Sequence, residues 1–198
     1  MKSIVILCIS GFLMVLYLID FKRNKLDLKT MVITSVFSAI SFVLYLFHII
    51  QYPQGGGITL FSMMPVMLLS LMYGRTAGLT GGLVFGFLKL LHGAYVINPA
   101  QFLLDYTLST MALGLADTFG HTTKWKMIGG CLFAVSISVG ISVLSGVLYF
   151  GQYAPEGMNV FWYSMAYNCS SAGVEGLLST ALISLMSLER LKGLAKVA

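Results

Sequence analysis

Seven long apolar runs dominate the chain, and short polar or basic stretches separate them. The runs cover residues 3–20, 30–50, 59–73, 76–92, 99–119, 127–150 and 160–188. Because a helix of roughly 17–25 apolar residues spans the hydrocarbon core of a bilayer, this pattern predicts seven membrane-spanning helices. The third run is the shortest, and its ends are the least sharply defined.

The composition also indicates a membrane protein. Hydrophobic residues make up 58% of the 198 residues and charged residues only 10%, with a mean hydropathy of +0.89. Soluble domains usually contain about 25% charged residues, so a soluble fold could not bury this much apolar surface. We therefore expect an all-α membrane protein with no separate soluble catalytic domain.

Basic residues are distributed unevenly between the two sets of loops that the seven helices define. The predicted cytoplasmic set contains Lys22, Arg23, Lys25, Lys29, Arg75, Lys124, Lys126, Arg190, Lys192 and Lys196, and the opposite set contains only Lys2. Since cytoplasmic loops are enriched in Lys and Arg, we expect the N-terminus outside and the C-terminus in the cytoplasm. The net charge of +5 then reflects membrane topology rather than nucleic-acid binding.

The first apolar run stands apart from the other six. A cleavable signal peptide carries its positive charges before the apolar run, but here the basic stretch 21–29 follows it. We therefore expect residues 1–29 to form an extra, uncleaved N-terminal transmembrane helix with a basic cytoplasmic linker. Residues 30–198 are expected to form a six-helix membrane domain.

Small residues recur at helical spacing in two of the predicted helices. Glycine occurs at every fourth position from residue 74 to residue 86, which places all four on one face of a helix. Such rows let helix backbones approach closely in lipid, so we expect a packing role. Ser35 and Ala39 form a weaker pair, which could contact a partner protein or a neighbouring helix of the same chain.

Three ionisable residues, Lys89, Asp105 and Glu175, lie inside predicted spans. Because a charge at the bilayer centre costs about 2.5–3.5 kcal/mol on insertion scales, such residues usually face a cavity or a partner. Asp105 lies six residues after Pro99, or about 9 Å into its helix. Asn168 lies at a similar depth, about 12 Å into the last helix. The sequence therefore predicts a pocket that opens to the outside.

In that pocket, the Asp105 carboxylate would bind a nitrogen-rich or cationic ligand, and Asn168 would fix its orientation. Aromatic rings for stacking or cation–π contact would come from Tyr95, Tyr106, Phe150, Trp162 and Tyr163. In the alternative interpretation, Lys89 and Asp105 pair internally and the aromatic residues form an interfacial belt, which suits Trp162 and Tyr153 better than a pocket does. Lys89 and Glu175 fit either interpretation.

Enzyme motifs such as H-E-x-x-H and G-x-x-x-x-G-K-[ST] are absent from the sequence. We therefore expect a binding protein without a cofactor, which needs an external source of energy or else only equilibrates its ligand. A different class remains open, because His48 and His92 fall near the outer face with Asp105 and could form the metal site of a membrane-embedded enzyme.

Several segments resemble one family of membrane proteins in order along residues 30–190. They are MPVMLLSL at 64–71, GRTAGLTGGL at 74–83, NPAQFLLDY at 98–106, Ser145-Gly146 with FGQYAP at 150–155, and WYSMAYN at 162–168. This series is similar to the thiamin-specific substrate-binding subunits, or S-components, of energy-coupling factor (ECF) transporters. The acid-Tyr and Tyr-x-x-x-x-Asn elements together carry most of the resemblance.

The resemblance implies a six-helix S-component in a prokaryotic cell membrane, which captures thiamin from outside. It would deliver the vitamin with a membrane scaffold subunit and two ATPase subunits. The carboxylate-Tyr pair for the aminopyrimidine matches Asp105 and Tyr106, and the pocket Tyr and Asn match Tyr163 and Asn168. Tyr95 matches a further pocket aromatic residue. The small-residue motif for the scaffold matches Ser35 and Ala39.

Some positions depart from the family pattern. A Lys and a His that are common on the fifth family helix align with Ser138 and Ser142, and Glu175 is an additional acid. Of the two serines, Ser142 is expected to contact the ligand. The pocket is then more anionic, which suits cationic thiamin but also a related pyrimidine or pyridine vitamer. A stand-alone facilitator without ATPase partners is a further alternative.

Overall fold

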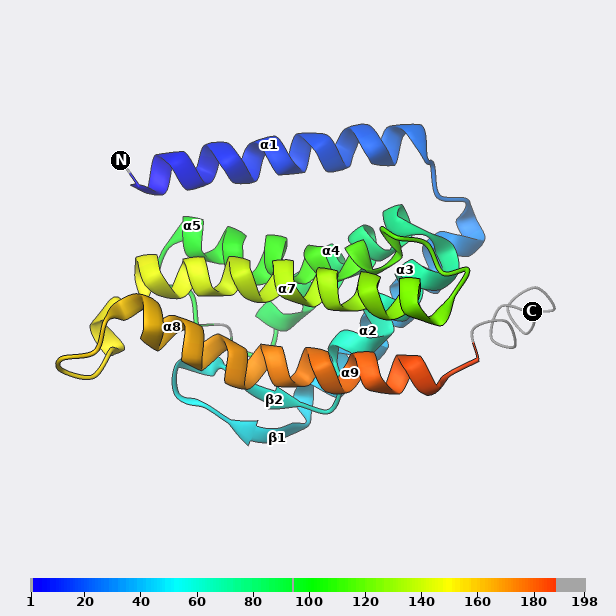
Figure 1. Ribbon diagram of the computed structural model, residues 1–198. Helices are drawn as coiled ribbons and strands as arrows, with labels where there is room; N and C mark the ends of the chain where they lie inside the picture. The colour runs from blue at the N-terminus through cyan, green and yellow to red at the C-terminus, as the bar shows by residue number, and fades with distance from the viewer. Residues whose placement is uncertain (1, 94, 188–198) are drawn as a thin grey trace.

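The computed structural model describes residues 2–93 and 95–187. Five helices are continuous: α1 (Lys2–Arg23), α2 (Leu28–Leu46), α3 (Met63–Tyr73), α4 (Arg75–Leu90) and α7 (Lys124–Tyr149). One composite segment contains α5 (Pro99–Phe102), η2 (Leu103–Leu108), α6 (Ser109–Ala112) and η3 (Leu113–Asp117). Another contains α8 (Val160–Asn168), η5 (Cys169–Gly173) and α9 (Val174–Leu185). Figure 1 shows α1, α7 and the α8–α9 segment running in roughly the same direction, along the long axis of the molecule.

The seven predicted helical runs agree with these segments to within a few residues, apart from the end of the second run. Helix α3, in the third run, is short, with 11 residues. Within the described residues, α2 and α7 are the two helices long and apolar enough to cross a membrane by length and composition. Part of the charge count lies outside the described residues, namely Arg190, Lys192 and Lys196.

Within residues 2–93 and 95–187, the fold departs from the all-α expectation at one place, a short β-hairpin after α2. Strands β1 (His48–Gln51) and β2 (Gly57–Thr59) pair antiparallel, with a 3-10 turn, η1 (Pro53–Gly55), between them. The prediction that the second helix continues to residue 50 is therefore wrong. The turn needs left-handed backbone at Gly55, with φ of 85°, which glycine adopts without steric cost.

Helix α2 has an inverted distribution of polar and apolar side chains. Its buried residues are Thr34, Ser38 and Ser41, while Val32 and Val43 are about half exposed. The Ser38 hydroxyl donates to the Gly81 carbonyl of α4 at 3.0 Å, which satisfies a polar group inside the bundle. A soluble protein places apolar side chains inward, so this arrangement is the one that an apolar solvent favours.

The glycine row of α4 allows this helix to pack closely against the η2–α6–η3 segment. A Cβ atom added at Gly82 would collide with the Thr110 carbonyl, and one at Gly86 with the Tyr106 carbonyl. The predicted packing role is confirmed for Gly78, Gly82 and Gly86, with a neighbour in the same chain. Gly74 differs, because it ends α3 with φ of 90° and so lies outside the packed face.

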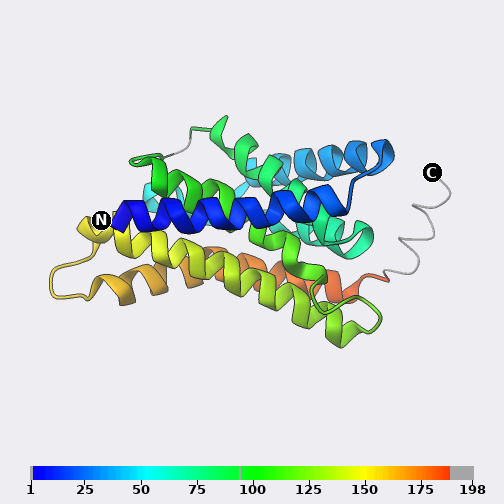
Figure 2. The same ribbon diagram turned by 90° about the horizontal axis from the view of Figure 1, so that it is seen from above.

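Helix α1 lies along the side of the bundle, across α4 and the α5–η2 segment (Figures 1 and 2). A short linker then leads into α2, whose first turn is capped by the Asp27 side chain. That carboxylate accepts a hydrogen bond from the Thr30 backbone N–H at 3.1 Å. The Thr30 hydrogen bonds hold the pKa of Asp27 below its usual value.

Candidate ligand-binding site

A cavity of about 180 Å³ lies among the hairpin, α2, α4, η2, α7, α8 and η5. Nine residues that the sequence analysis assigned to a ligand pocket line it. They are Lys89, Tyr95, Asp105, Tyr106, Ser142, Phe150, Tyr163, Asn168 and Glu175. The structure therefore brings residues from several different segments to one place, although their contacts differ from those expected.

Asp105 is oriented by two hydrogen bonds on one of its oxygens. Its Oδ2 accepts from Gln101 Nε2 and from Ser145 Oγ, each at 2.8 Å. Its Oδ1 has no hydrogen-bond partner within the described part of the chain. Since an ionised carboxylate offers about four lone-pair sites, the site holds a fixed carboxylate with acceptor capacity to spare. That arrangement suits a ligand that donates hydrogen bonds.

Two of the segments that line the cavity are π-helical, η2 and η5. The first carries Asp105 and Tyr106, and the second directly follows Asn168. A π-helical turn is wider than an α-helical turn and occurs frequently at functional sites. The sequence analysis missed both segments, because hydrophobic periodicity over five or six residues does not separate π from α geometry.

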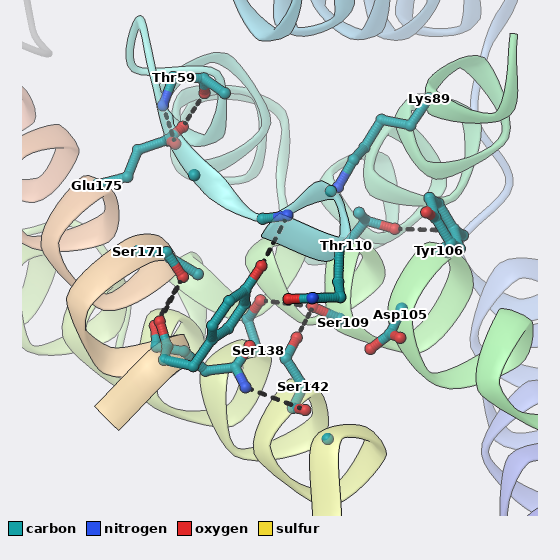
Figure 3. A pocket seen from close by; sticks show the side chains of 18 of the residues that line it. Thr59, Lys89, Asp105, Tyr106, Ser109, Thr110, Ser138, Ser142, Ser171 and Glu175 are labelled. Carbon is teal, nitrogen blue, oxygen red and sulfur yellow. Dashed lines mark hydrogen bonds between the residues drawn. The ribbon is translucent and has the colours of Figure 1, made fainter. Parts of the chain in front are cut away.

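Hydroxyl groups line the wall of the cavity next to Asp105. Ser109 Oγ lies 3.1 Å from Ser138 Oγ and 3.1 Å from Ser142 Oγ (Figure 3). Asn168 Nδ2 donates to the Ser164 carbonyl at 2.9 Å and to the Ser142 carbonyl at 3.4 Å. This wall therefore offers neutral donors and acceptors. Ser109 was not singled out from the sequence, since only its position in space links it to the site.

Lys89 contacts aromatic rings rather than the Asp105 carboxylate. Its Nζ lies 4.8 Å from the ring centroid of Tyr45, 5.6 Å from that of Tyr106 and 5.7 Å from that of Phe85. The ion pair considered between Lys89 and Asp105 is therefore not formed. Cation–π attraction to three rings replaces it, because electron-rich ring faces stabilise an ammonium group in a desolvated place.

Glu175 anchors the hairpin. It is 3% exposed, and its carboxylate accepts from the Thr59 backbone N–H at 2.8 Å, from Thr59 Oγ1 at 2.7 Å and from Ser62 Oγ at 2.7 Å (Figure 3). Three hydrogen bonds to one buried carboxylate offset part of the cost of removing it from water. Its contacts therefore support the internal interpretation, although it also borders the cavity.

Besides the Glu175 contacts, hydrogen bonds from Tyr167 hold the turn of the hairpin over the cavity. The Tyr167 hydroxyl accepts from the Gly56 backbone N–H at 3.0 Å and donates to the Pro53 carbonyl. Residues 54–57 of this turn line the cavity, so the hairpin forms one of its walls. Tyr167 was not assigned to the pocket from the sequence, because its partners are backbone groups 111 and 114 residues away.

Aromatic residues form the remaining side of the cavity. The hydroxyls of Tyr95 and Tyr153 lie 2.7 Å apart, and this contact raises the pKa of Tyr95 above its ordinary value. The Tyr95 backbone N–H donates to the Tyr106 hydroxyl at 3.1 Å, which links the loop before α5 to η2. Trp162 is 62% exposed and lies outside the cavity lining, as the interfacial interpretation expected.

The histidine metal site considered from the sequence is not formed. The rings of His48 and His92 are stacked, with centroids 6.4 Å apart, and both pack around Tyr45. Asp105 belongs to the hydroxyl-lined wall instead. Among the described residues, no group of three or more His, Cys, Asp or Glu side chains is placed to hold a metal ion.

Comparisons with known proteins consistently find similarity to thiamine transporters. Thiamine transporter ThiT of Bacillus subtilis is 34% identical over 134 residues, which are 61% of this chain and 69% of that protein. Thiamine transporter ThiT of Lacticaseibacillus paracasei is 28% identical over 142 residues, or 64% of this chain and 71% of that protein.

The fold is also that of a solved relative, ThiT from Listeria monocytogenes. The two structures superpose with a TM-score of 0.72 at 23% identity, over 81% of this chain and 93% of that one. A family model described as thiamine transporter protein (Thia_YuaJ) matches residues 31–194. With a match over most of its length, the chain belongs to the thiamine transporter protein family.

Proposed function

We propose that this protein is the substrate-binding S-component of an ECF-type importer and that its ligand is thiamin. The observation that carries the proposal is the oriented Asp105 carboxylate, which lines the cavity and whose Oδ1 has no partner in the described chain. Family membership supports it, since the matched relatives are thiamine transporters and not enzymes. Capture is therefore proposed here as binding without chemical change.

Thiamin combines an aminopyrimidine with a cationic thiazolium ring, and the cavity offers a partner for each. The amino group and a protonated ring nitrogen donate hydrogen bonds, which Asp105 can accept at the η2 wall. Tyr106 and Tyr163 offer ring faces for stacking, and tyrosine faces attract cations. The amide of Asn168 lies close enough to the same wall to fix the ligand's orientation.

The direct test is calorimetry on the purified protein with thiamin, set beside pyridoxine and a simple aminopyrimidine. We expect saturable one-to-one binding of thiamin that is tighter than binding of either comparison compound. Calorimetry suits this chain better than tryptophan fluorescence, because Trp125 and Trp162 are exposed and do not line the cavity. Absence of thiamin binding would refute the proposal, and tighter binding of pyridoxine would reassign the ligand to another vitamer.

We further propose that the protein spans the cell membrane with its N-terminus outside. The apolar, exposed face of α2 fits lipid contact, and the uneven distribution of basic residues supports the orientation. In this orientation the hairpin and the Asp105 wall lie toward the outer side. The test compares two variants, each with a single cysteine, one in the hairpin turn and one in the loop 118–123. A thiol reagent that cannot cross the membrane should label the hairpin cysteine from outside and leave the cysteine in the loop 118–123 unlabelled.

Uptake against a concentration gradient needs an energy source, and this sequence contains no phosphate-binding loop. We propose a scaffold subunit and two ATPase subunits as partners, with Ser35 and Ala39 on the scaffold-contact face. Both are exposed on α2 between larger apolar residues such as Val32 and Val36. Small side chains at this spacing let a partner helix approach closely.

The partner proposal predicts a specific effect of bulk on α2. Ala39→Leu should greatly reduce co-purification with the scaffold and ATPase subunits, because the added side chain separates the helix backbones. Thiamin affinity should remain unchanged, since Ala39 does not line the cavity. Ala166→Leu, at an exposed position of α8, is the matched control and should co-purify normally. Equal recovery of the two variants would place the scaffold contact elsewhere.

A further inference from the structure

We propose that α1, which precedes the family match, is a positioning helix. It supports the ligand-binding segment η2 on the side that faces away from the cavity. This inference rests on the proposed function and extends it. The family model begins at residue 31, so the family match does not include α1. In Figures 1 and 2, α1 lies across α4 and the α5–η2 segment for most of its length.

The contact of α1 with the α5–η2 segment includes Ile6. This side chain is 6% exposed and forms one apolar cluster with Ala100, Leu104 and Leu108. Leu104 and Leu108 belong to η2, on either side of Asp105 and Tyr106 in the sequence. The apolar cluster is therefore part of the same short segment that supplies the carboxylate of the site.

One face of the α5–η2–α6 segment lines the cavity, and the next face belongs to the apolar cluster. Gln101, Asp105 and Ser109, four residues apart, line the cavity. Leu104 and Leu108, one residue earlier in each repeat, belong instead to the apolar cluster that includes Ile6 and is also packed by residues of α7. A shift of η2 away from α1 would therefore move the Asp105 carboxylate relative to Ser145 and the hydroxyl-lined wall.

Polar contacts near the other end of α1 set its register along α4. Tyr17 OH lies 2.9 Å from Thr80 Oγ1, Asp20 pairs with Arg75 at 3.3 Å, and Asp20 accepts from Thr76 Oγ1 at 2.9 Å. Asp20 and Ile6 are about 21 Å apart along the axis of α1, so the contacts with α4 and with η2 lie at opposite ends of this helix. The helix is thus attached at both ends, once to α4 and once to η2.

The positioning role of α1 can be argued from what would surround η2 without this helix in a lipid bilayer. If α1 were absent, the apolar surface of the α5–η2 segment that it covers would face lipid tails, which are as apolar as a leucine side chain. The helix therefore adds little hydrophobic free energy, and its contribution lies in packing the wider π-helical turn against a defined surface. Binding groups need such support, because loosely held groups lose affinity.

The test uses the full chain with Ile6→Ala and the matched control Ile4→Ala. Ile4 lies on the same helix, is 65% exposed and belongs neither to the apolar cluster around Ile6 nor to the cavity lining. We expect Ile6→Ala to raise the thiamin Kd roughly five- to tenfold and to speed hydrogen exchange in residues 99–108. Ile4→Ala should leave both unchanged. The unfolding temperatures of the two variants should be similar.

Tyr17→Phe provides a second, milder variant in case Ile6→Ala folds poorly. It removes the hydroxyl bonded to Thr80 and keeps the ring, so exchange in residues 99–108 should rise by a smaller factor. An unchanged Kd or unchanged exchange in Ile6→Ala would overturn the inference and leave α1 with a purely structural role. If the unmodified protein bound no thiamin, the proposed function would fail, while the exchange measurement would still test the support of η2.

Discussion

Replacing Asp105 with asparagine is expected to weaken thiamin binding roughly 10- to 100-fold, since a hydrogen bond to a charged group contributes about 1.5–3 kcal/mol. Asparagine has nearly the same shape, so the cavity should persist. Its amide oxygen can replace Oδ2 and accept from Gln101 and Ser145, which leaves the NH2 group in the place of Oδ1, where it opposes the ligand's own donors. Calorimetric titration of the purified variant measures the effect.

Asp117→Asn is the matched control for this experiment. Asp117 is the last residue of η3 and makes a polar side-chain contact, to His121 at 2.7 Å, but it does not line the cavity. Its thiamin affinity should equal that of the unmodified protein. Equal affinities of the Asp105 and Asp117 variants would remove Asp105 from the site and, with it, the observation on which the proposed function rests.

Gly82→Ala is expected to destabilise the fold by about 1–3 kcal/mol, the usual cost of overpacking a well-packed interface. The added Cβ would meet the backbone of Thr110 and Met111, which cannot rotate away as a side chain could. Helix α4 would then separate from the α6 segment and disturb neighbouring η2. A lowered unfolding temperature, together with weaker thiamin binding, is the measurable result.

Gly140→Ala distinguishes this clash from a general effect of alanine. Gly140 lies in helix α7, and a Cβ added there would meet no atom within 4 Å. Alanine stabilises a helix relative to glycine by about 1 kcal/mol, so this control should be neutral or slightly more stable. If Gly82→Ala behaved in the same way, α4 would have room to adjust, and the glycine row would not be needed for close packing.

Two acids and one lysine line the cavity, and no ion pair joins them in the described part of the chain. Asp105 is held by neutral donors, Glu175 by the hairpin, and Lys89 by aromatic rings. Each charge therefore has its own local support before a ligand arrives. Such preorganisation lowers the cost of binding, because few groups must be reordered around the ligand.

Much of the candidate site could be predicted because burial of charge in a membrane is costly. That single constraint singled out Lys89, Asp105 and Glu175, and helix depth added Asn168 near the same level. The partners of these residues could not be predicted. Glu175 bonds Thr59 and Ser62, which lie 116 and 113 residues away in the sequence, and no local pattern encodes that pairing.

The sequence by itself determined where the helical segments lie, because long apolar runs in a bilayer must satisfy their backbone hydrogen bonds within the segment. It also determined that α4 packs closely, since only glycine permits backbone contact at Gly82 and Gly86. Only the tertiary structure decided the hairpin over the cavity, the π-helical turns and the place of α1. These depend on contacts between distant segments, where packing and hydrogen bonds across the bundle outweigh local preference.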